Sequence, residues 1–494
     1  MLVEPLLHYA QKSPNDVFIH DDRGDHTFAQ IAGAASALSM LISFKTQRPN
    51  VGLLLPSSAA FVASFYGTLL AGKTVVPINF LLGPAEVAHV LKDSGVDLVI
   101  SIGPLASRLP TDQLQVIDLL QLPQSKDLSV PTEIPAAAAS KKPDDIAVLM
   151  YTSGTSGLPK GVCLSFDNLQ SDVDASIKHA RLERKHRFLG VLPLFHAFGM
   201  TAMMLAPIQL GATVIFMARF NPVATINAIR DKQVSLVFAV PSMFAAIANV
   251  KAATADDFKS IYAMMCGGEP TPSNLIAAYK SRFNVNLYEG YGLTETSPVA
   301  ALNVPNEYRT GSVGKPVPGL SVRIVDDAGI DCMVGDSGEV WLKGPMVMRG
   351  YYNLPRETAA VLTSDGFFKT GDLGKLDADG FLHITGRKKD LIIVAGEKAV
   401  PREIEEILMK HPTVAEAAVV GKKDASRGEV VVAFVLPREK QEIKPEELRD
   451  FCRKEGLMQW KIPREIFVEK DLPRSPTGKI LKRELIARLA QPVA

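Results

Sequence analysis

The chain has 494 residues, which is too long for one hydrophobic core, so at least two domains are expected. Its 54 Lys and Arg residues balance 53 Asp and Glu residues, and the basic residues are scattered, which gives no support for a nucleic-acid surface. The widely spaced Cys163, Cys266, Cys332 and Cys452 fit neither a zinc pattern nor a disulfide framework, and they indicate a cytoplasmic protein.

From the sequence we predict neither a signal peptide nor a transmembrane helix. Its first residues lack a basic start and a continuous apolar run. Two uncharged stretches, 51–72 and 188–218, are interrupted by prolines such as Pro56 and Pro193, whereas a membrane-spanning helix needs about 20 mostly apolar residues. Buried strand–helix units are therefore expected in both stretches, and peripheral contact with a membrane surface stays open.

Residues 16–389 alternate short β-branched runs with amphipathic stretches. Strands are expected at 51–55, 98–101, 146–151, 161–165, 212–217 and 235–240, and helices at 221–232 and 272–283. This alternation is typical of layered α/β sheets with largely parallel strands. After Pro316, short runs at 320–326, 338–343 and 381–384 are separated by Gly and Asp turns and predict a small barrel-like β subdomain.

The character of the chain changes again at the charged run 386–390. Such a charged run is more often a solvated turn than a hinge, but the change in character marks a domain boundary, and we predict a large domain at 1–386 and a small one at 387–494. The small domain is expected to be α+β. Its predicted helices are 401–409, 445–455 and 480–489, and its predicted strands are 419–420 and 430–436.

The segment 151–161, Tyr-Thr-Ser-Gly-Thr-Ser-Gly-Leu-Pro-Lys-Gly, combines hydroxyls, glycines and a lysine between two predicted strands. Glycines let backbone N–H groups converge on phosphate oxygens, and Lys160 adds a positive charge. Leu158 and Pro159 separate Gly157 from Lys160, so this is not a Walker loop. A polar hairpin turn would explain Ser, Thr and Gly, but it would not explain a lysine after proline.

Further motifs occur in a fixed order along the chain: 193–196 (Pro-Leu-Phe-His), 267–270 (Gly-Gly-Glu-Pro), 291–296 (Tyr-Gly-Leu-Thr-Glu-Thr), 369–372 (Lys-Thr-Gly-Asp), 386–390 (Gly-Arg-Lys-Lys-Asp) and 473–479 (Pro-Arg-Ser-Pro-Thr-Gly-Lys). Together with the loop they resemble the adenylate-forming superfamily, which includes acyl-CoA and aryl-CoA synthetases, peptide-synthetase adenylation domains and luciferase. The resemblance is greatest to bacterial fatty-acid CoA ligases. It implies ATP- and Mg²⁺-dependent joining of a carboxylic acid to coenzyme A through an acyl-adenylate.

The resemblance also implies the residues of a nucleotide site. The expected ATP- and AMP-binding residues are Thr152, Ser153, Gly154, Thr155, Ser156, Gly157, Lys160, Gly268, Glu269, Pro270, Glu289, Gly290, Tyr291, Gly292, Asp372, Ile384 and Arg387. Thr294 is expected to contact the α-phosphate, and Glu295 to hold Mg²⁺ together with Thr155. Mg²⁺ commonly takes one or two carboxylates plus phosphates and waters, so one glutamate suffices.

Four further roles follow from the resemblance. Lys479 is expected to bridge the carboxylate and the α-phosphate, and His196 to lie beside the carboxylate, although a lone His in an apolar run is more often a core residue. Lys389 is the expected hinge of a rotating small domain. Gly396, Glu397 and Lys398 are expected on the coenzyme A side. Family members commonly carry Asn or an aromatic residue after that Gly-Glu pair, so Lys398 departs from the pattern.

The expected acyl pocket is lined by Ala197, Met200, Thr201, Met243, Gly267 and Val299. Its small and aliphatic residues favour a medium- or long-chain fatty acid over an amino acid. Residues 357–372 are compact and lack the insertion of fatty acyl-AMP ligases, which favours coenzyme A as the acceptor. An aryl-acid CoA ligase and an acyl-carrier-protein synthetase remain alternatives, and a nonenzymatic nucleotide sensor is a remote one.

Overall fold

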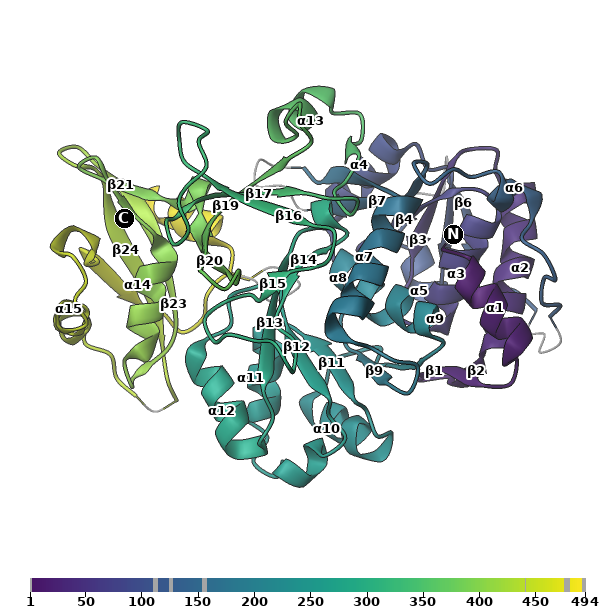
Figure 1. The fold of residues 1–494 in the computed structure, drawn as a ribbon, viewed down its shortest axis with the longest axis horizontal. Helices are drawn as coiled ribbons and strands as arrows, with labels where there is room; N and C mark the ends of the chain where they lie inside the picture. Colours follow the sequence, from purple (N-terminus) through teal and green to yellow (C-terminus); the bar gives the residue numbers. More distant parts are fainter. Residues whose placement is uncertain are drawn as a thin grey trace. The chain divides into compact units, whose positions relative to one another are not determined.

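The computed structural model describes residues 2–109, 114–123, 128–152, 158–439, 441–474 and 480–490 (Figure 1). The chain forms two compact units. The first comprises Met1–Gly268, Ala277–Ser321 and Leu342–Phe368, and the second comprises Glu269–Ile276, Val322–Trp341 and Lys369–Ala494. The predicted mixed α/β class, with a large N-terminal part and a smaller C-terminal part, is confirmed. The domain boundary predicted at 387 stays a prediction.

One sheet of the first unit contains the strands that carry several predicted site residues. Its strand order is β15 (Lys315–Pro316), β14 (Val299–Leu302), β13 (Leu287–Gly292), β12 (Ala263–Cys266), β11 (Leu236–Ala239), β9 (Arg187–Gly190), β10 (Thr213–Phe216), β1 (Val17–Asp21) and β2 (Gly24–Thr27). The strands from β13 to β1 run parallel, and the outer pairs are antiparallel. The central parallel strands β9 to β12 are almost fully buried, as expected for strands covered on both faces.

A second sheet of the same unit carries the predicted phosphate loop. Its strand order is β18 (Gly350–Tyr351), β8 (Lys160–Ser165), β7 (Ile146–Thr152), β4 (Thr74–Pro77), β3 (Asn50–Leu54), β5 (Leu98–Ser101) and β6 (Gln115–Asp118). β7, β8 and β18 pair antiparallel, so the loop predicted between two strands does join β7 to β8. The expected strand at 98–101 coincides with β5, and the others agree within one or two residues.

Helices cover these sheets. Their bounds are α1 (Glu4–Lys12), α2 (Phe28–Lys45), α3 (Ala59–Leu70), α4 (Pro84–Ser94), α5 (Gly103–Ala106), α6 (Ala136–Ala139), α7 (Phe166–Ala180), α8 (Ala197–Met200), α9 (Ala206–Leu210), α10 (Pro222–Asp231), α11 (Pro241–Ala248), α12 (Ser273–Phe283) and α13 (Pro355–Val361). A π-helix, η1 (Thr201–Leu205), connects α8 to α9. π-helical turns often occur at functional sites.

Helix α2 was not among the stretches weighed as membrane spans, yet among the described helices it is the one long and apolar enough to cross a membrane. It begins with a capping box in which Thr27 and Gln30 exchange hydrogen bonds of 2.9 and 3.2 Å. Its inner face packs on α3, where a Cβ on Gly67 would approach the Ala35 carbonyl oxygen to 2.9 Å. Packing this close also occurs between the core helices of globular proteins. The length and composition of α2 alone are weak evidence that it crosses a membrane.

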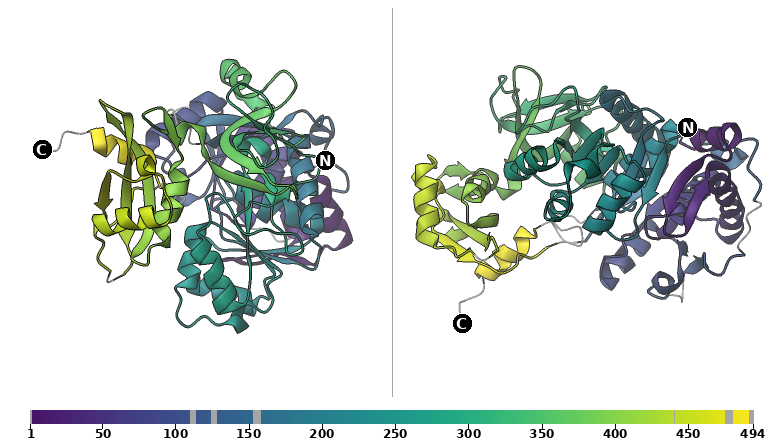
Figure 2. Two further views of the ribbon diagram at one scale, coloured as in Figure 1. Left: turned by 60° about the vertical axis from the view of Figure 1, so that its left-hand side comes forward. Right: turned by 90° about the horizontal axis from the view of Figure 1, so that it is seen from below.

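The second unit contains the small β subdomain and the C-terminal fold. The subdomain strands follow the order β16 (Ser321–Val325), β17 (Gly338–Lys343), β19 (Phe368–Leu376) and β20 (Leu382–Arg387). The C-terminal sheet follows the order β22 (Glu397–Ala399), β21 (Ile392–Val394), β24 (Gly428–Pro437) and β23 (Val414–Asp424), with β25 (Glu465–Val468) beside β24. Figure 2 gives two further views of this sheet, in light green and yellow.

The C-terminal sheet and its helices enclose a separate core. Helices α14 (Pro401–Lys410), α15 (Pro445–Lys454) and α16 (Lys482–Ala490) match the predicted helices within two residues. Ile404 and Leu408 on α14 and Leu448 on α15 are fully buried against the sheet. A core of its own is what a domain needs to fold independently, which agrees with the small domain expected here.

Candidate functional site

Predicted site residues follow the carboxyl ends of four adjacent parallel strands. His196 comes after β9, Met243 after β11 and Gly267 after β12, while Tyr291 lies at the end of β13. These strands are neighbours in the order β13, β12, β11, β9. Ligands of α/β proteins bind outside the carboxyl ends of parallel strands. The topology therefore brings these distant sequence motifs to one edge of the sheet.

The turn after β13 places Glu295 through close backbone packing. Gly292 cannot carry a side chain here, because a Cβ would lie 1.9 Å from the Pro298 carbonyl oxygen. A 3₁₀ turn, η3 (Thr294–Thr296), follows, and the Thr296 hydroxyl donates to the same Pro298 oxygen at 2.7 Å. Thr201 on the π-helix donates to the Ser297 carbonyl oxygen at 2.9 Å. Thr294 and Glu295 are thus fixed by their neighbours rather than held on a free loop.

Tyr351 links Glu295 to the predicted phosphate loop. Its hydroxyl donates to Glu295 Oε1 at 2.8 Å, and Lys160 Nζ lies 5.4 Å from the centre of its ring. Burial first, and then the charge of Glu295, raises the pKa of Tyr351, so the hydroxyl keeps its proton and remains a donor. Sequence reasoning missed this residue because its role depends on pairing of β18 with β8.

The ends of the predicted phosphate loop are held by the antiparallel pair β7 and β8. Thr152 lies opposite Lys160, and Tyr151 lies opposite Gly161 in the strand register. Tyr151 is anchored by its hydroxyl, which donates to Asp93 at 2.6 Å. Ser153, Gly154, Thr155, Ser156 and Gly157, including the predicted metal ligand Thr155, lie outside the described residues.

His196 precedes the short helix α8 and is poorly solvated. Its Nε2 atom is buried and has no hydrogen-bond partner among the residues that the structure describes. Burial lowers the pKa of His196 to about 4, so the ring is neutral at neutral pH. Most buried polar atoms are hydrogen-bonded, so a buried ring nitrogen without a partner suits the predicted position of His196 beside a bound polar group.

The predicted acyl-pocket residues lie on elements that adjoin this edge of the sheet. Ala197 and Met200 lie on α8, Thr201 begins η1, Met243 lies on α11 and Val299 begins β14. Ala197 and Met200 are buried, with 4% and 0% of their surfaces exposed. Gly267 lies close to an aromatic ring, since a Cβ there would lie 3.3 Å from Phe198. These residues are mainly apolar, and that they line one acyl pocket stays a prediction.

The remaining predicted adenine-side residues follow β12 or lie on β13. Gly268 has a φ of +85°, a conformation that favours glycine, and Glu269 and Pro270 continue the segment into the second unit. Glu289, Gly290, Tyr291 and Gly292 form the second part of β13, and Glu289 is buried. These positions suit close backbone approach to a flat ligand.

In the second unit, Asp372 and Arg387 face each other across β19 and β20. They are register partners, and Arg387 Nε lies 2.7 Å from Asp372 Oδ1. Only 3% of the Asp372 side chain is exposed. The Thr370 hydroxyl accepts from the Asp372 N–H at 3.0 Å and orients the turn. Ile384, also on β20, accepts through its carbonyl oxygen from Arg402 at 2.7 Å.

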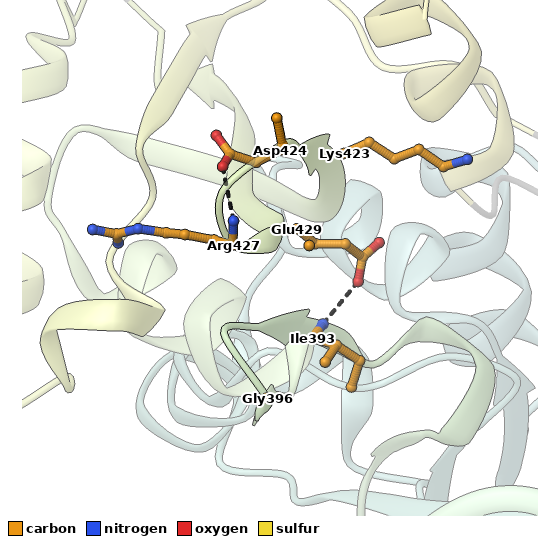
Figure 3. A pocket seen from close by; sticks show the side chains of 8 residues that line it. Ile393, Gly396, Lys423, Asp424, Arg427 and Glu429 are labelled. Carbon is orange, nitrogen blue, oxygen red and sulfur yellow. Dashed lines mark hydrogen bonds between the residues drawn. The ribbon is translucent and has the colours of Figure 1, made fainter.

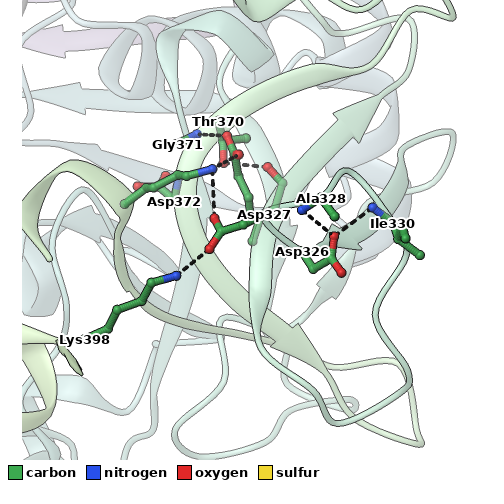
Figure 4. A network of polar contacts seen from close by, with 11 residues as sticks. Asp326, Asp327, Ala328, Ile330, Thr370, Gly371, Asp372 and Lys398 are labelled. Carbon is green, nitrogen blue, oxygen red and sulfur yellow. Dashed lines mark hydrogen bonds and ion pairs between the residues drawn. The ribbon is translucent and has the colours of Figure 1, made fainter. Parts of the chain in front are cut away.

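Ion pairs surround the predicted hinge and the predicted coenzyme A segment. Lys389 lies in the 3₁₀ turn η4 (Lys388–Asp390), where burial lowers its pKa. Lys388 Nζ lies 3.2 Å from Glu339 and 3.4 Å from Asp327. Lys398, at the hairpin between β21 and β22 that also contains Gly396 and Glu397, pairs with Asp327 as well (Figure 4). Asp327 thus connects hinge and hairpin within this unit.

An open hollow of about 590 Å³ lies beside Gly396 and is lined partly by Lys423, Arg427 and Glu429 (Figure 3). Its wall is built by Asp424, which accepts from the Arg427 N–H at 3.0 Å, and by Glu429, which accepts from the Ile393 N–H at 2.7 Å. In Figure 3 the Lys423 and Arg427 side chains extend in opposite directions from this turn. Sequence reasoning did not single out either basic residue.

No cluster of three or more His, Cys, Asp or Glu side chains that could hold a metal occurs in the described residues. A magnesium site built by side chains alone is therefore not found there. A single carboxylate suits Mg²⁺ that is held mainly by phosphate oxygens and water. Glu295, half-buried and linked through Tyr351 to the neighbourhood of Lys160, is the carboxylate predicted for this role, and the assignment stays a prediction. Lys479 lies outside the described residues.

Comparisons with known proteins agree with this geometry. Residues 6–352 match the AMP-binding enzyme family, and residues 403–479 match the AMP-binding enzyme C-terminal domain. The chain is 33% identical to feruloyl-CoA synthase of Amycolatopsis sp over 97% of both chains. It is also 33% identical to the long-chain-fatty-acid–CoA ligase of Bacillus subtilis (strain 168), over 88% of this chain and 85% of the relative.

Solved structures also match over nearly the whole chain. The o-succinylbenzoate CoA synthetase of Bacillus subtilis, in complex with its acyl-adenylate intermediate, matches with a TM-score of 0.86 and 31% identity over 97% of both chains. A structure of the same synthetase with ATP and magnesium ion matches with a TM-score of 0.85 and 30% identity, covering 97% of this chain and 98% of that one.

Proposed function

The chain belongs to the AMP-binding enzyme family, and from that premise we propose that it joins a medium- or long-chain fatty acid to coenzyme A. It is an AMP-forming acid–CoA ligase that uses ATP, Mg²⁺ and coenzyme A. The observation that supports a fatty acid is the apolar lining around Met200, Ala197 and Val299. Fatty-acid, feruloyl and coumarate CoA ligases are all about equally similar relatives.

In the first half-reaction a carboxylate oxygen bonds to the α-phosphorus of ATP and pyrophosphate leaves. Both reactants are anionic, so donors and cations must be in place before the transition state. In our proposal Lys160 and the phosphate loop bind the outer phosphates, Thr294 binds the α-phosphate and Glu295 holds Mg²⁺, which offsets phosphate charge. Lys479 bridges carboxylate and α-phosphate.

His196 contributes as a neutral ring in this proposal. Its buried, unpaired Nε2 supports a position beside the acid carboxylate, and an uncharged ring does not neutralise the attacking carboxylate. The Asp372 carboxylate accepts hydrogen bonds from the ribose hydroxyls, with Arg387 holding its orientation. Tyr291 stacks near adenine.

In the second half-reaction the thiol sulfur attacks the acyl carbon, AMP leaves and the thiol proton is lost. We propose that the small domain rotates about Lys389 between one orientation for adenylate formation and another for thioester formation. Release of Lys398, which follows the pivot, from Asp327, which precedes it, then accompanies the movement. Lys423 and Arg427 line the hollow beside Gly396, and their positive charges suit the phosphates of coenzyme A. A carrier protein would hold its phosphate group in a different position.

An aryl acid is the second candidate. Its support is the feruloyl-CoA synthase relative, which matches 97% of the chain at the same identity as the fatty-acid ligase. The four cysteines are free in the structure, which supports a cytoplasmic setting as part of the proposal.

The test is pyrophosphate release across a panel of fatty and aryl acids, with and without coenzyme A or a holo acyl carrier protein. We expect the highest kcat/KM with decanoate-to-palmitate chain lengths and thioester formation only with coenzyme A. Higher kcat/KM for cinnamate derivatives than for every fatty acid would replace the fatty-acid proposal by the aryl one. Thioester formation only with the carrier protein would contradict coenzyme A as the acceptor.

A further inference from the structure

Helix α7 carries an acidic residue into the interior of the first unit. The helix begins directly after β8 with reciprocal hydrogen bonds between Ser165 and Asn168 of 2.9 and 3.1 Å, which fix its start. Asp172, two turns along, is 0% exposed. One of its oxygens, Oδ1, accepts from the Val299 N–H at 3.1 Å. Asp172 therefore contacts the backbone of a predicted acyl-pocket residue.

Two polar side-chain atoms of α7 near this contact lack a hydrogen-bond partner among the described residues. Neither Asp172 Oδ2 nor Ser176 Oγ, one helical turn later, has a hydrogen-bond partner among the described residues, although both atoms are buried. Residues four apart lie on the same face of a helix. Burial raises the pKa of Asp172 well above its ordinary range.

This face of α7 packs against the two elements that carry predicted pocket residues. It contacts η1, which begins with Thr201, and β14, which begins with Val299. Farther along the helix, His179 Nε2 bonds to the Leu302 carbonyl oxygen at 2.8 Å, so α7 follows β14 over its length. The unpaired oxygens thus belong to a helix that packs against two elements with predicted pocket residues.

We propose that Asp172 and Ser176 form a polar subsite of the acyl pocket that binds a hydroxyl group on the otherwise apolar body of the acid. This inference rests on the proposed function and narrows its substrate class to hydroxylated acids. A hydroxyl can donate to Asp172 Oδ2 and accept from the Ser176 hydroxyl, which satisfies both buried groups at once. Leaving buried polar groups unpaired is costly, so an acid without the hydroxyl binds less well.

The experiment compares kcat/KM for pyrophosphate release within matched pairs of acids that differ only in a hydroxyl. One pair is dodecanoate and 12-hydroxydodecanoate, and the other is cinnamate and 4-hydroxycinnamate, which separates a fatty from an aryl source. We expect the wild-type enzyme to favour the hydroxylated member of one pair by about tenfold to a hundredfold. Asp172→Leu should reduce that ratio to about one, and Ser176→Ala should reduce it in part.

Two variants separate recognition from a purely structural role. Asp172→Asn keeps an acceptor for the Val299 N–H and a donor for the hydroxyl, so it should retain most of the preference. Asp174→Asn changes an exposed residue of the same helix and should leave the ratio unaltered. If Asp172→Leu does not fold, Asp172→Asn and Ser176→Ala still test the proposal. A recognition role predicts that Asp172→Asn keeps most of the preference for the hydroxylated acid and that Ser176→Ala loses part of it. A purely structural role predicts the same preference in both variants.

Equal kcat/KM values for both members of both pairs in the wild type would overturn this inference. They would not contradict the proposed ligase activity. A wild-type preference that survives in both Asp172→Leu and Ser176→Ala would overturn it as well. If no acid supports pyrophosphate release, the proposed function fails, and the subsite fails with it.

Discussion

Replacing Tyr351 by Phe removes a single hydroxyl from the link between Glu295 and the phosphate loop. That hydroxyl donates to Glu295 Oε1 at 2.8 Å. The Phe ring would keep its position near Lys160, now 5.4 Å from the ring centre, and the pairing of β18 with β8 does not involve the hydroxyl. The change therefore isolates the orientation of Glu295, the proposed magnesium carboxylate.

The expected magnitude follows from the type of hydrogen bond. A hydrogen bond to a charged group contributes about 1.5–3 kcal/mol, and the half-buried setting of Glu295 places this one at the lower end. Since each 1.36 kcal/mol is tenfold in rate, kcat/KM for MgATP should fall by about tenfold. The free energy of unfolding should fall by no more than about 1.5 kcal/mol, because the substitution removes this one hydrogen bond and no apolar contact.

The assay is pyrophosphate release at saturating acid while Mg²⁺ and ATP are varied. Tyr351→Phe should need more Mg²⁺ for half-maximal rate. Tyr352→Phe is the matched control, since it removes the hydroxyl of the neighbouring tyrosine, whose backbone N–H bonds to Gly161 at 2.7 Å. In a double-mutant cycle with Glu295→Gln the two losses should not add. Unaltered Mg²⁺ dependence, or full additivity, would refute a shared role.

Three other predictions follow from the site. Lys479→Ala should lower pyrophosphate release by about 10²–10³, while the variant still converts supplied acyl-adenylate and coenzyme A into product; equal loss in both half-reactions would disprove the assigned role. Burial lowers the pKa of His196 to about 4, below its ordinary 6.5. The unfolded chain then binds the proton first, so stability is complete above pH 6.5 and is lost as the pH falls towards 4. His196→Phe should flatten the free energy of unfolding, measured with urea, across that window, and an unaltered slope would contradict it. Gly292→Ala should cost about 1–3 kcal/mol of stability, because a Cβ would overlap the Pro298 carbonyl oxygen. Gly83→Ala, whose Cβ would meet only Glu86 at 3.7 Å, should cost little, and equal melting temperatures would refute the packing argument.

Short apolar runs with clear turn residues at both ends could be predicted from the sequence. The runs at 98–101 and 338–343 coincide with β5 and β17. By contrast, β23 was expected at 419–420 and spans Val414–Asp424. Its outer residues include Lys422, which pairs with Glu465 on β25 at 2.8 Å, so a partner distant in sequence stabilises positions that look polar and irregular.

The site was predicted only as far as its motifs extend. Tyr351 carries no local signal, because its contact with Glu295 is made by strand pairing. For Asp172 the sequence does contain a local signal. Asp172 lies on the same helical face as the buried Leu169, and an acidic residue among buried apolar positions marks a special environment.

The central claim, that the acid is activated by adenylation, is tested most directly with a carboxylic acid labelled with oxygen-18 in both carboxylate oxygens. The acid is incubated with ATP, Mg²⁺ and coenzyme A, and the nucleotide and phosphate products are analysed by mass spectrometry. Attack of the carboxylate on the α-phosphorus predicts AMP that carries one labelled oxygen, with unlabelled pyrophosphate. ADP as the nucleotide product, with the label in inorganic phosphate, would contradict the account.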